Sequence, residues 1–235
     1  MPPTLTFVPG TMCDRRIWEP VWRELNGRFP VGYIPIETTF THDGMIGLFD
    51  TAASVGRKLN LVAFSMGGYL ALQYTLDHPD RVASLAVIGT SAFGLSEKEK
   101  AERGRALKYL ATHEYRGIPP SRINPFVHPS HQSDPGVVDV IRAMDRDLGK
   151  EVLMAQLRET TTRESLEPRL RELDCPVLLV GSDSDPYLSP ADIERMHALI
   201  PHSRRELARE AGHMLPLEQP AWLAARIAGL HPAGN

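Results

Sequence analysis

Cysteine and long apolar runs are both scarce in this chain. The two cysteines among 235 residues, Cys13 and Cys175, make no disulfide framework and lie at no metal-ligand spacing. No apolar run approaches the length that crosses a bilayer. The first residues, Met1 to Leu5, lack the basic region and apolar stretch of a secretory signal. We therefore expect a cytoplasmic protein with two reduced thiols and no membrane span.

An excess of basic residues is also lacking. The chain has 26 Lys and Arg against 29 Asp and Glu, with a formal net charge of −3. A nucleic-acid-binding surface would need clustered excess Lys and Arg, so we expect no nucleic-acid partner. Hydrophobic residues at 42% and charged residues at 23% are typical of a globular protein. The length suits one domain, with or without a small insertion, as a monomer or homodimer acting on a small molecule.

Short apolar runs alternate with helical patterns over most of the chain. This alternation predicts a mostly parallel sheet covered by helices on both faces, a three-layer α/β fold. The expected strands are Leu5–Val8, Val31–Ile36, Leu59–Phe64, Val82–Gly89, Pro176–Val180 and Arg205–Ala208. The expected helices are Ile17–Leu25, Asp43–Val55, Met66–Asp77, Ile193–Leu199 and Ala221–Leu230.

The middle of the chain, from about Ser91 to Leu173, has no convincing strand. Helical patterns cover Glu97–Ala111 and Lys150–Thr161, and a Pro-rich loop covers Gly117–Pro129. A further helix places apolar side chains along one face, at Val137, Val140, Ile141, Met144 and Leu148. We interpret this block as a helical insertion between two strands of the sheet.

A serine between an apolar strand and a helix is the most informative local feature. Residues 63–67 are Ala-Phe-Ser-Met-Gly, followed by Gly68. A strand–turn–helix setting is that of the G-x-S-x-G nucleophile elbow, whose tight turn needs small residues on both sides of the serine. Serine is also a common helix N-cap. The preceding strand and the two glycines favour a nucleophile at Ser65.

A serine hydroxyl needs a base to take its proton, and the base needs an acid to orient it. Among nine histidines, His213 follows the last expected strand, where ligands of such sheets gather. In this fold the acid precedes the histidine. Asp183 and Asp185 both follow the strand Pro176–Val180. Asp185 has cleared the strand and is favoured, whereas Asp183 has the position of a turn residue.

Two backbone amides are candidates for stabilising an oxyanion. The Met66 N–H lies at the start of the helix after the serine, where the helix dipole favours negative charge. The second donor is expected from the loop after the first strand. Gly10 permits a close backbone approach in that loop, so we predict the Thr11 N–H. Cys13 and Asp14 flank the site as structural or pocket-lining residues.

These segments together resemble the α/β-hydrolase superfamily, in the esterase-like group that includes enol-lactonases. The resemblance covers nearly the whole chain and is specific for fold and triad but not for substrate. The matching segments are Phe7-Val8-Pro9-Gly10 with Trp18, Leu61 to Gly68, His78-Pro79-Asp80-Arg81-Val82, Cys175 to Gly181, Ala211-Gly212-His213-Met214 and Glu218-Gln219-Pro220.

The chain departs from the family in three places. Pro9 stands where the family usually has histidine before the oxyanion-loop glycine. The chain begins at the strand Leu5–Val8, without the strand pair that usually precedes it, so we expect about six strands. The acid loop is one residue longer than the common pattern, which leaves Asp183 as the rival of Asp185.

The resemblance implies a core of residues 1–92 and 171–235 and a helical lid of residues 93–170. Such a lid supplies much of the acyl pocket. The candidate lining residues are Met144, Leu148, Met154 and Leu157. Packing of the lid onto itself explains each of these four residues equally well.

The resemblance implies hydrolysis of a carboxylic ester or thioester through an acyl-enzyme on Ser65, with no metal or organic cofactor. A triad-bearing lyase, synthase or acyltransferase acting on a small carbonyl substrate is the alternative. A catalytically silent binding module would have a damaged triad, and a dehalogenase would have aspartate at the elbow. His128, His131 and Asp134 have metal-like spacing, but their Pro-rich surroundings favour solvent-exposed histidines.

Overall fold

The computed structural model describes residues 2–53 and 57–231. Its described residues contain one six-stranded sheet in the order β2-β1-β3-β4-β5-β6, and all five strand pairings are parallel. The strands are β1 (Leu5–Val8), β2 (Val31–Tyr33), β3 (Leu59–Phe64), β4 (Val82–Ile88), β5 (Val177–Ser182) and β6 (Arg204–Ala208). The predicted sheet of about six strands is confirmed.

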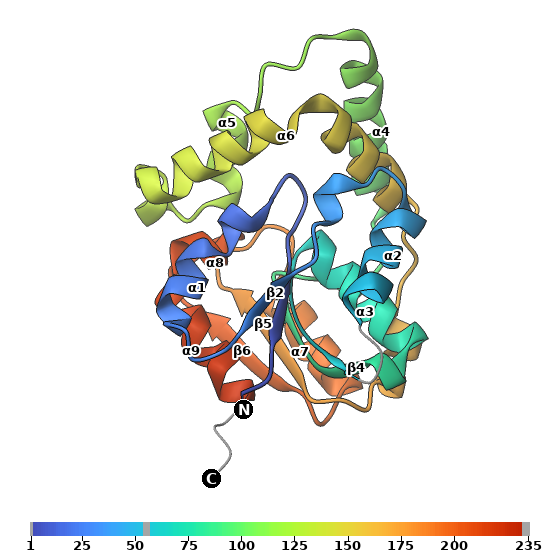
Figure 1. Ribbon diagram of the computed structural model, residues 1–235. Coiled ribbons are helices and arrows are strands. Elements are labelled where there is room, and N and C mark those ends of the chain that lie inside the picture. Colours follow the sequence, from blue (N-terminus) through green and yellow to red (C-terminus); the bar gives the residue numbers. More distant parts are fainter. Residues whose placement is uncertain (1, 54–56, 232–235) are drawn as a thin grey trace.

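Alternating side chains of the central strands fill two separate cores. In β3, Leu61 and Ala63 pack on one face of the sheet, and Val62 and Phe64 pack on the other. Both faces of a parallel sheet are normally covered, and Figure 1 shows helices on each side. One face carries α2 (His42–Ala52), α3 (Met66–Asp77) and α7 (Pro190–Leu199), and the other carries α1 (Glu19–Leu25), α8 (Leu215–Glu218) and α9 (Pro220–Leu230). The predicted three-layer fold is confirmed.

The helical insertion lies between β4 and β5 and crosses the end of the sheet where the strands finish (Figure 1). Its helices are α4 (Glu97–Thr112), α5 (Pro120–Ile123) and α6 (Pro135–Thr161). The two helices expected from residue 137 to Thr161 follow one another in α6 and are separated by a kink at Gly149, where φ is 73° and ψ is −174°. Only glycine adopts such a backbone without strain, and its lack of a Cβ therefore permits the kink.

Some element boundaries differ from those expected. β2 ends at Tyr33 rather than Ile36, because Pro35 has no N–H to continue the sheet ladder. α2 ends at Ala52, and Val55, the expected end of that helix, lies outside the described residues. The Pro-rich loop contains the short helix α5, which begins at Pro120, a favoured residue at the first helical position.

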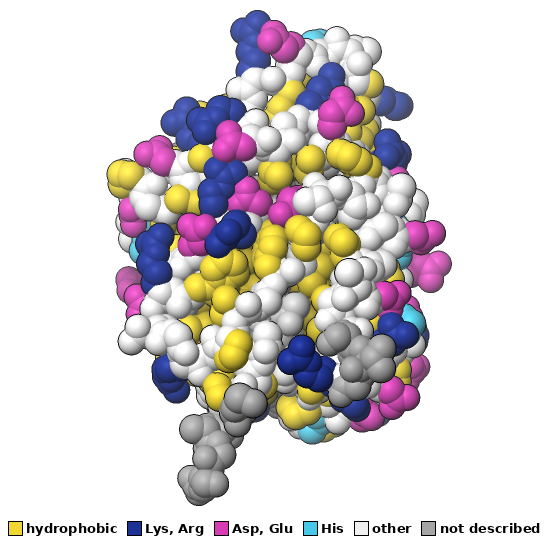
Figure 2. Space-filling view, in the orientation of Figure 1, with side chains coloured by type: hydrophobic (Ala, Val, Ile, Leu, Met, Phe, Trp, Pro, Cys, Tyr) yellow, Lys and Arg dark blue, Asp and Glu magenta, His cyan; other side chains and the backbone are white. Residues whose placement is uncertain are grey.

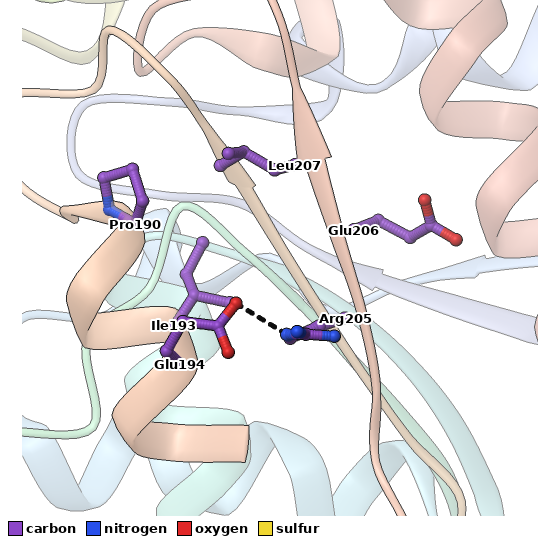
Figure 3. A pocket seen from close by; sticks show the side chains of 6 residues that line it. All are labelled: Pro190, Ile193, Glu194, Arg205, Glu206 and Leu207. Atoms are coloured by element: carbon purple, nitrogen blue, oxygen red, sulfur yellow. Dashed lines mark hydrogen bonds and ion pairs between the residues drawn. The ribbon is translucent and has the colours of Figure 1, made fainter. Parts of the chain in front are cut away.

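The surface in view mixes charges of both signs. Figure 2 shows Lys and Arg side chains interspersed with Asp and Glu over this face, without an extended patch of one sign on its described residues. A hollow of about 190 Å³ lies between α7 and the edge strand β6. Arg205 and Glu194 form an ion pair across it at 2.7 Å (Figure 3). Its volume is below that of ordinary ligand pockets, which begin at about 300 Å³.

Within residues 2–53 and 57–231, no helix is long and apolar enough to cross a bilayer.

Candidate active site

Ser65 lies in a strained turn between β3 and α3. Its backbone has φ of 51° and ψ of −117°, outside the regions that residues with a Cβ adopt freely. Its N–H donates to the Ile88 carbonyl of the neighbouring strand at 2.9 Å. A Cβ at Gly67 would collide with the Pro9 carbonyl oxygen, and one at Gly68 would collide with Thr90. The glycines after the serine are therefore required by the close packing of the elbow against β1 and β4.

His213 bridges the serine and an aspartate. The Ser65 hydroxyl donates to Nε2 of His213 at 3.0 Å. The opposite ring nitrogen, Nδ1, donates to Oδ2 of Asp185 at 2.8 Å. The side chains of His213 and Asp185 are 9% and 1% exposed. The structure thus brings together three residues that are far apart in the sequence, in the geometry that activates a serine hydroxyl.

The two rival aspartates have different neighbours. Asp185 accepts the Tyr187 N–H at 2.8 Å with the oxygen that does not face His213. Asp183 accepts the Glu210 N–H at 3.0 Å and the Ala211 N–H at 3.4 Å. Burial opposes the shift, but the hydrogen bonds from Glu210, Ser184 and Ala211 lower the pKa of Asp183. Asp183 therefore holds the loop that leads to the histidine, and Asp185 alone of the two contacts the imidazole.

A buried glutamate holds the other side of the histidine loop. Oε2 of Glu218 accepts the N–H of Gly212 and the N–H of His128, both at 2.9 Å. The Phe126 carbonyl accepts the His213 N–H at 2.8 Å. Glu218 thereby ties the histidine loop to the insertion. In the sequence, Glu218 stands out only as part of a family motif, five residues after the histidine.

Aromatic rings enclose the imidazole of His213. The ring centroids of Phe64 and Tyr187 each lie 4.9 Å from that of His213, and the Tyr187 ring meets it edge-on. A Cβ at Gly89 would lie 3.3 Å from Nδ1 of His213, so the end of β4 also confines the ring. Tyr187 was not predicted, although it follows Asp185 by only two residues. These contacts restrict the imidazole to one orientation.

The loop after β1 packs against the elbow. A Cβ at Gly10 would lie 2.8 Å from the Phe64 ring and 3.1 Å from Cβ of Ser65, so only glycine fits there. The Met12 N–H donates to Oε1 of Gln156 at 2.9 Å. In the described part of the chain, the N–H groups of Thr11 and Met66 have no hydrogen-bond acceptor. Both predicted amides are thus unengaged beside the serine.

The predicted pocket-lining residues differ in burial. Met144 is fully buried, and its Sδ lies 3.5 Å from the Asp14 N–H. It therefore packs the insertion against the loop after β1. Leu148, Met154 and Leu157 are half-buried.

The residues with metal-like spacing serve local structure. Nδ1 of His128 shares a hydrogen bond with the Ser130 hydroxyl at 2.7 Å. Asp134 accepts the Gly136 N–H at 2.8 Å and caps the start of α6. Within residues 2–53 and 57–231, no three His, Cys, Asp or Glu side chains are grouped to hold a metal ion.

A serine elbow above a parallel three-layer sheet is the architecture of the α/β hydrolases. The sequence profile of the alpha/beta hydrolase fold family matches residues 35–220. The chain belongs to this family. The resemblance inferred from the sequence motifs is therefore confirmed.

Esterases and a synthase are among the relatives of known name. A pimeloyl-[acyl-carrier protein] methyl ester esterase of Neisseria meningitidis is 26% identical, over 88% of this chain and 84% of that protein. A provisionally named 2-succinyl-6-hydroxy-2,4-cyclohexadiene-1-carboxylate synthase of Bacillus subtilis is 27% identical over 69% of this chain. That match spans 62% of the synthase, which is less than two thirds of its length. A thermophilic esterase from Thermogutta terrifontis has a structure similar to this one, with a TM-score of 0.85, 26% identity and coverage of 99% and 91% of the two chains.

Proposed function

We propose that this protein hydrolyses a carboxylic ester or thioester through an acyl-enzyme on Ser65. The observation that carries the proposal is the hydrogen-bonded series from the Ser65 hydroxyl through His213 to Asp185 at the end of the sheet. Membership of a family rich in esterases supports the same reaction. The similarity to the N. meningitidis esterase and the T. terrifontis esterase adds to that support.

In the first half of the reaction, Oγ of Ser65 attacks the acyl carbonyl and Nε2 of His213 takes the hydroxyl proton. The carbonyl oxygen becomes an oxyanion, which the N–H groups of Thr11 and Met66 stabilise. The bond to the leaving group then breaks, and His213 returns the proton to the departing alcohol or thiol. Asp185 holds the imidazole in the required tautomer and stabilises its positive charge.

In the second half, water attacks the acyl-serine. His213 takes a proton from the water and gives it to Oγ of Ser65 as the carboxylic acid departs. Each proton taken by the imidazole is returned, so the residues close the cycle by themselves without a metal or an organic cofactor. We further propose that the helical insertion, residues 93–170, covers the site as a lid. The hydrogen bond from Met12 to Gln156 and that from His213 to Phe126 support this role.

The test is labelling with a fluorophosphonate probe together with turnover of an activated ester. The wild type is expected to bind the probe covalently, and Ser65→Ala is expected to lose labelling and about 10⁴-fold or more of kcat. Ser91→Ala, which changes a serine just beyond neighbouring strand β4, is the matched control and should retain both. Equal labelling of the wild type and Ser65→Ala would remove Ser65 from its role. A burst of product equal to the enzyme concentration would support the acyl-enzyme over lyase or synthase chemistry.

A further inference from the structure

Two arginines of the helical insertion have far fewer hydrogen-bond acceptors than N–H donors. A guanidinium carries five N–H donors. Arg103 on α4 makes one hydrogen bond among the described residues, to the Thr160 hydroxyl at 2.9 Å. Arg163, just after α6, makes none there, and its Nε is buried without an acceptor. Both side chains are half-buried, and neither forms an ion pair within residues 2–53 and 57–231, although charges withdrawn from water are normally paired.

The surroundings compensate this positive charge only in part. Burial lowers the pKa of Arg103. Burial, and then the charge of Arg103, lower the pKa of Arg163 to about 10. The carboxylate that acts on both, Glu99, is held by the Ser96 N–H and hydroxyl in the capping box at the start of α4. The Tyr69 ring, 5.0 Å from the Arg163 guanidinium, supplies only a cation–π contact.

Both arginines act on tyrosines that adjoin the triad. Tyr69, on which Arg163 stacks, is on α3 one turn beyond Ser65, a rise of about 5.4 Å. The charge of Arg103 also acts on Tyr187, whose ring packs against His213. A groove of about 510 Å³ opens beside Arg163 and beside Thr160, the hydrogen-bond partner of Arg103. It is also lined by Arg158, Arg169 and the carboxylates of Asp77, Glu159 and Glu164. The volume falls within the range of ordinary ligand pockets.

A neutral hydrogen-bond donor on α6 also lacks an acceptor. Gln156 lies one turn before Thr160 on α6 and is fully buried. Because the Met12 N–H donates to one end of its amide, that end is the oxygen. The other end, Nε2, is therefore a donor, and it is buried without a partner among the described residues. The insertion thus presents donors, charged and neutral, without matching acceptors.

We propose that Arg103 and Arg163 bind an anionic group of the substrate, a carboxylate or a phosphate, apart from the ester that Ser65 attacks. Nε2 of Gln156 donates to an oxygen of the same substrate. The planar fork of a guanidinium matches the paired oxygens of both anions. The inference rests on the proposed function, because it names the substrate class of that same site. The expected substrate is a small ester or thioester with a negative charge on its acyl chain or on its leaving group.

The test compares kcat/KM within two matched pairs of substrates. Monomethyl glutarate and dimethyl glutarate differ by a carboxylate. S-acetyl-4′-phosphopantetheine and S-acetylpantetheine differ by a phosphate. The wild type is expected to prefer the charged member of one pair, and that pair identifies the anion. Arg103→Gln and Arg163→Gln should each lower the ratio of charged to neutral turnover by about 10- to 100-fold.

Exposed arginines of the same helices provide the controls. Arg105→Gln on α4 and Arg142→Gln on α6 remove an equal charge outside the groove and should leave the ratio within about threefold. Arg103→Lys and Arg163→Lys keep the charge and should retain part of the preference. These two variants and the wild-type ratio decide the matter if the glutamine variants do not fold.

Two results would overturn the inference: a wild-type enzyme without preference for the charged member of either pair, or arginine variants with the wild-type ratio. Failure of the proposed function would give a different result in these experiments. In that case, neither member of either pair is hydrolysed and the fluorophosphonate probe does not label Ser65.

Discussion

The sheet and the helical insertion differ in how many of their polar side chains near the site have hydrogen-bond partners. On the sheet side, the carboxylates around the histidine accept hydrogen bonds, although Oε1 of Glu218 is buried without a donor in the described part of the chain. Asp185 accepts from His213 and Tyr187, and Glu218 accepts two backbone N–H groups with one oxygen. On the insertion side, Arg103, Arg163 and Gln156 keep donors without acceptors in the described part of the chain.

This difference separates the reaction from the choice of substrate. Satisfied hydrogen bonds hold the serine, histidine and aspartate in place before a substrate arrives, which is what a reaction centre requires. A donor without an acceptor contributes the most binding free energy when a ligand supplies the missing oxygen atom. Substitutions on the sheet side should therefore lower turnover of every substrate alike. Substitutions on the insertion side should change one substrate relative to another.

The largest difference should come from the two aspartates. Asp185→Asn removes the charge that stabilises the imidazolium and is expected to lower kcat by about 10⁴-fold. Asp183→Asn keeps one oxygen, which can accept the Glu210 N–H, and loses only the longer hydrogen bond from the Ala211 N–H, so it should cost about tenfold or less. Steady-state kinetics on both members of each substrate pair would measure the effects, and the charged-to-neutral ratio should stay constant. The reverse ranking would assign the acid role to Asp183.

The next effect concerns Glu218. Glu218→Ala leaves the N–H groups of Gly212 and His128 without their acceptor, each at a cost of about 1–3 kcal/mol in stability. The histidine loop is then released, and kcat should fall by about 10- to 100-fold, since displacements of 1 Å at a catalytic group have effects of that size. Glu218→Gln retains an oxygen acceptor and is the matched control. Thermal melting and kcat would be measured together, and a Glu218→Ala protein with the wild-type kcat would contradict the role.

The kink of α6 provides a test on the insertion side. Gly149→Ala places a Cβ on a backbone that only glycine adopts freely, at a cost of about 1–3 kcal/mol. Each kcal/mol should lower Tm by about 2–4 °C. Open space around the added Cβ excludes a clash as the cause. Gly104→Ala, inside α4 and equally unobstructed, should instead raise stability by up to about 1 kcal/mol. Equal melting temperatures for the two variants would show that the kink is not strained.

The smallest effect is expected from the two thiols. Burial, with Asp14 as the second cause, raises the pKa of Cys13, and burial raises the pKa of Cys175 to about 11. Since the thiolate is the reactive form, both cysteines should be protonated and slow to alkylate at pH 8. Treatment with iodoacetamide should leave esterase activity nearly unchanged, although Cys13 lies only two residues from Thr11. Rapid inactivation at pH 8 would mean that the loop after β1 opens enough to expose the thiol.

The sheet was predictable because each strand carries its own signal. β1 and β3 lie where the apolar runs are, and the elbow follows from Ser65 and its glycines. The order of serine, aspartate and histidine then led to His213 and Asp185, which the structure brings into hydrogen-bond contact. These inferences depend on local patterns and on the known order of the elements in a parallel sheet.

The insertion was less predictable, because its important contacts join residues far apart in the chain. Met12 and Gln156 are separated by 144 positions, and no local pattern marks either as the partner of the other. Arg103 and Arg163 resemble ordinary surface charges in the sequence, since a helix face with arginine is normally solvated. Gly149 was visible between two helical stretches, but its positive φ and the direction of the kink depend on tertiary packing.

The way the insertion joins the sheet domain has a consequence for protein engineering. The Leu166 N–H donates to the Ala92 carbonyl at 2.9 Å, so the insertion departs from and rejoins the scaffold at neighbouring points. A module attached in this way is exchangeable without a change in strand order, and α/β hydrolases with other specificities become donors for chimeras. A transplanted module needs three matching groups: an acceptor for the Met12 amide, one for the His213 amide, and a donor to Glu218 in place of the His128 amide.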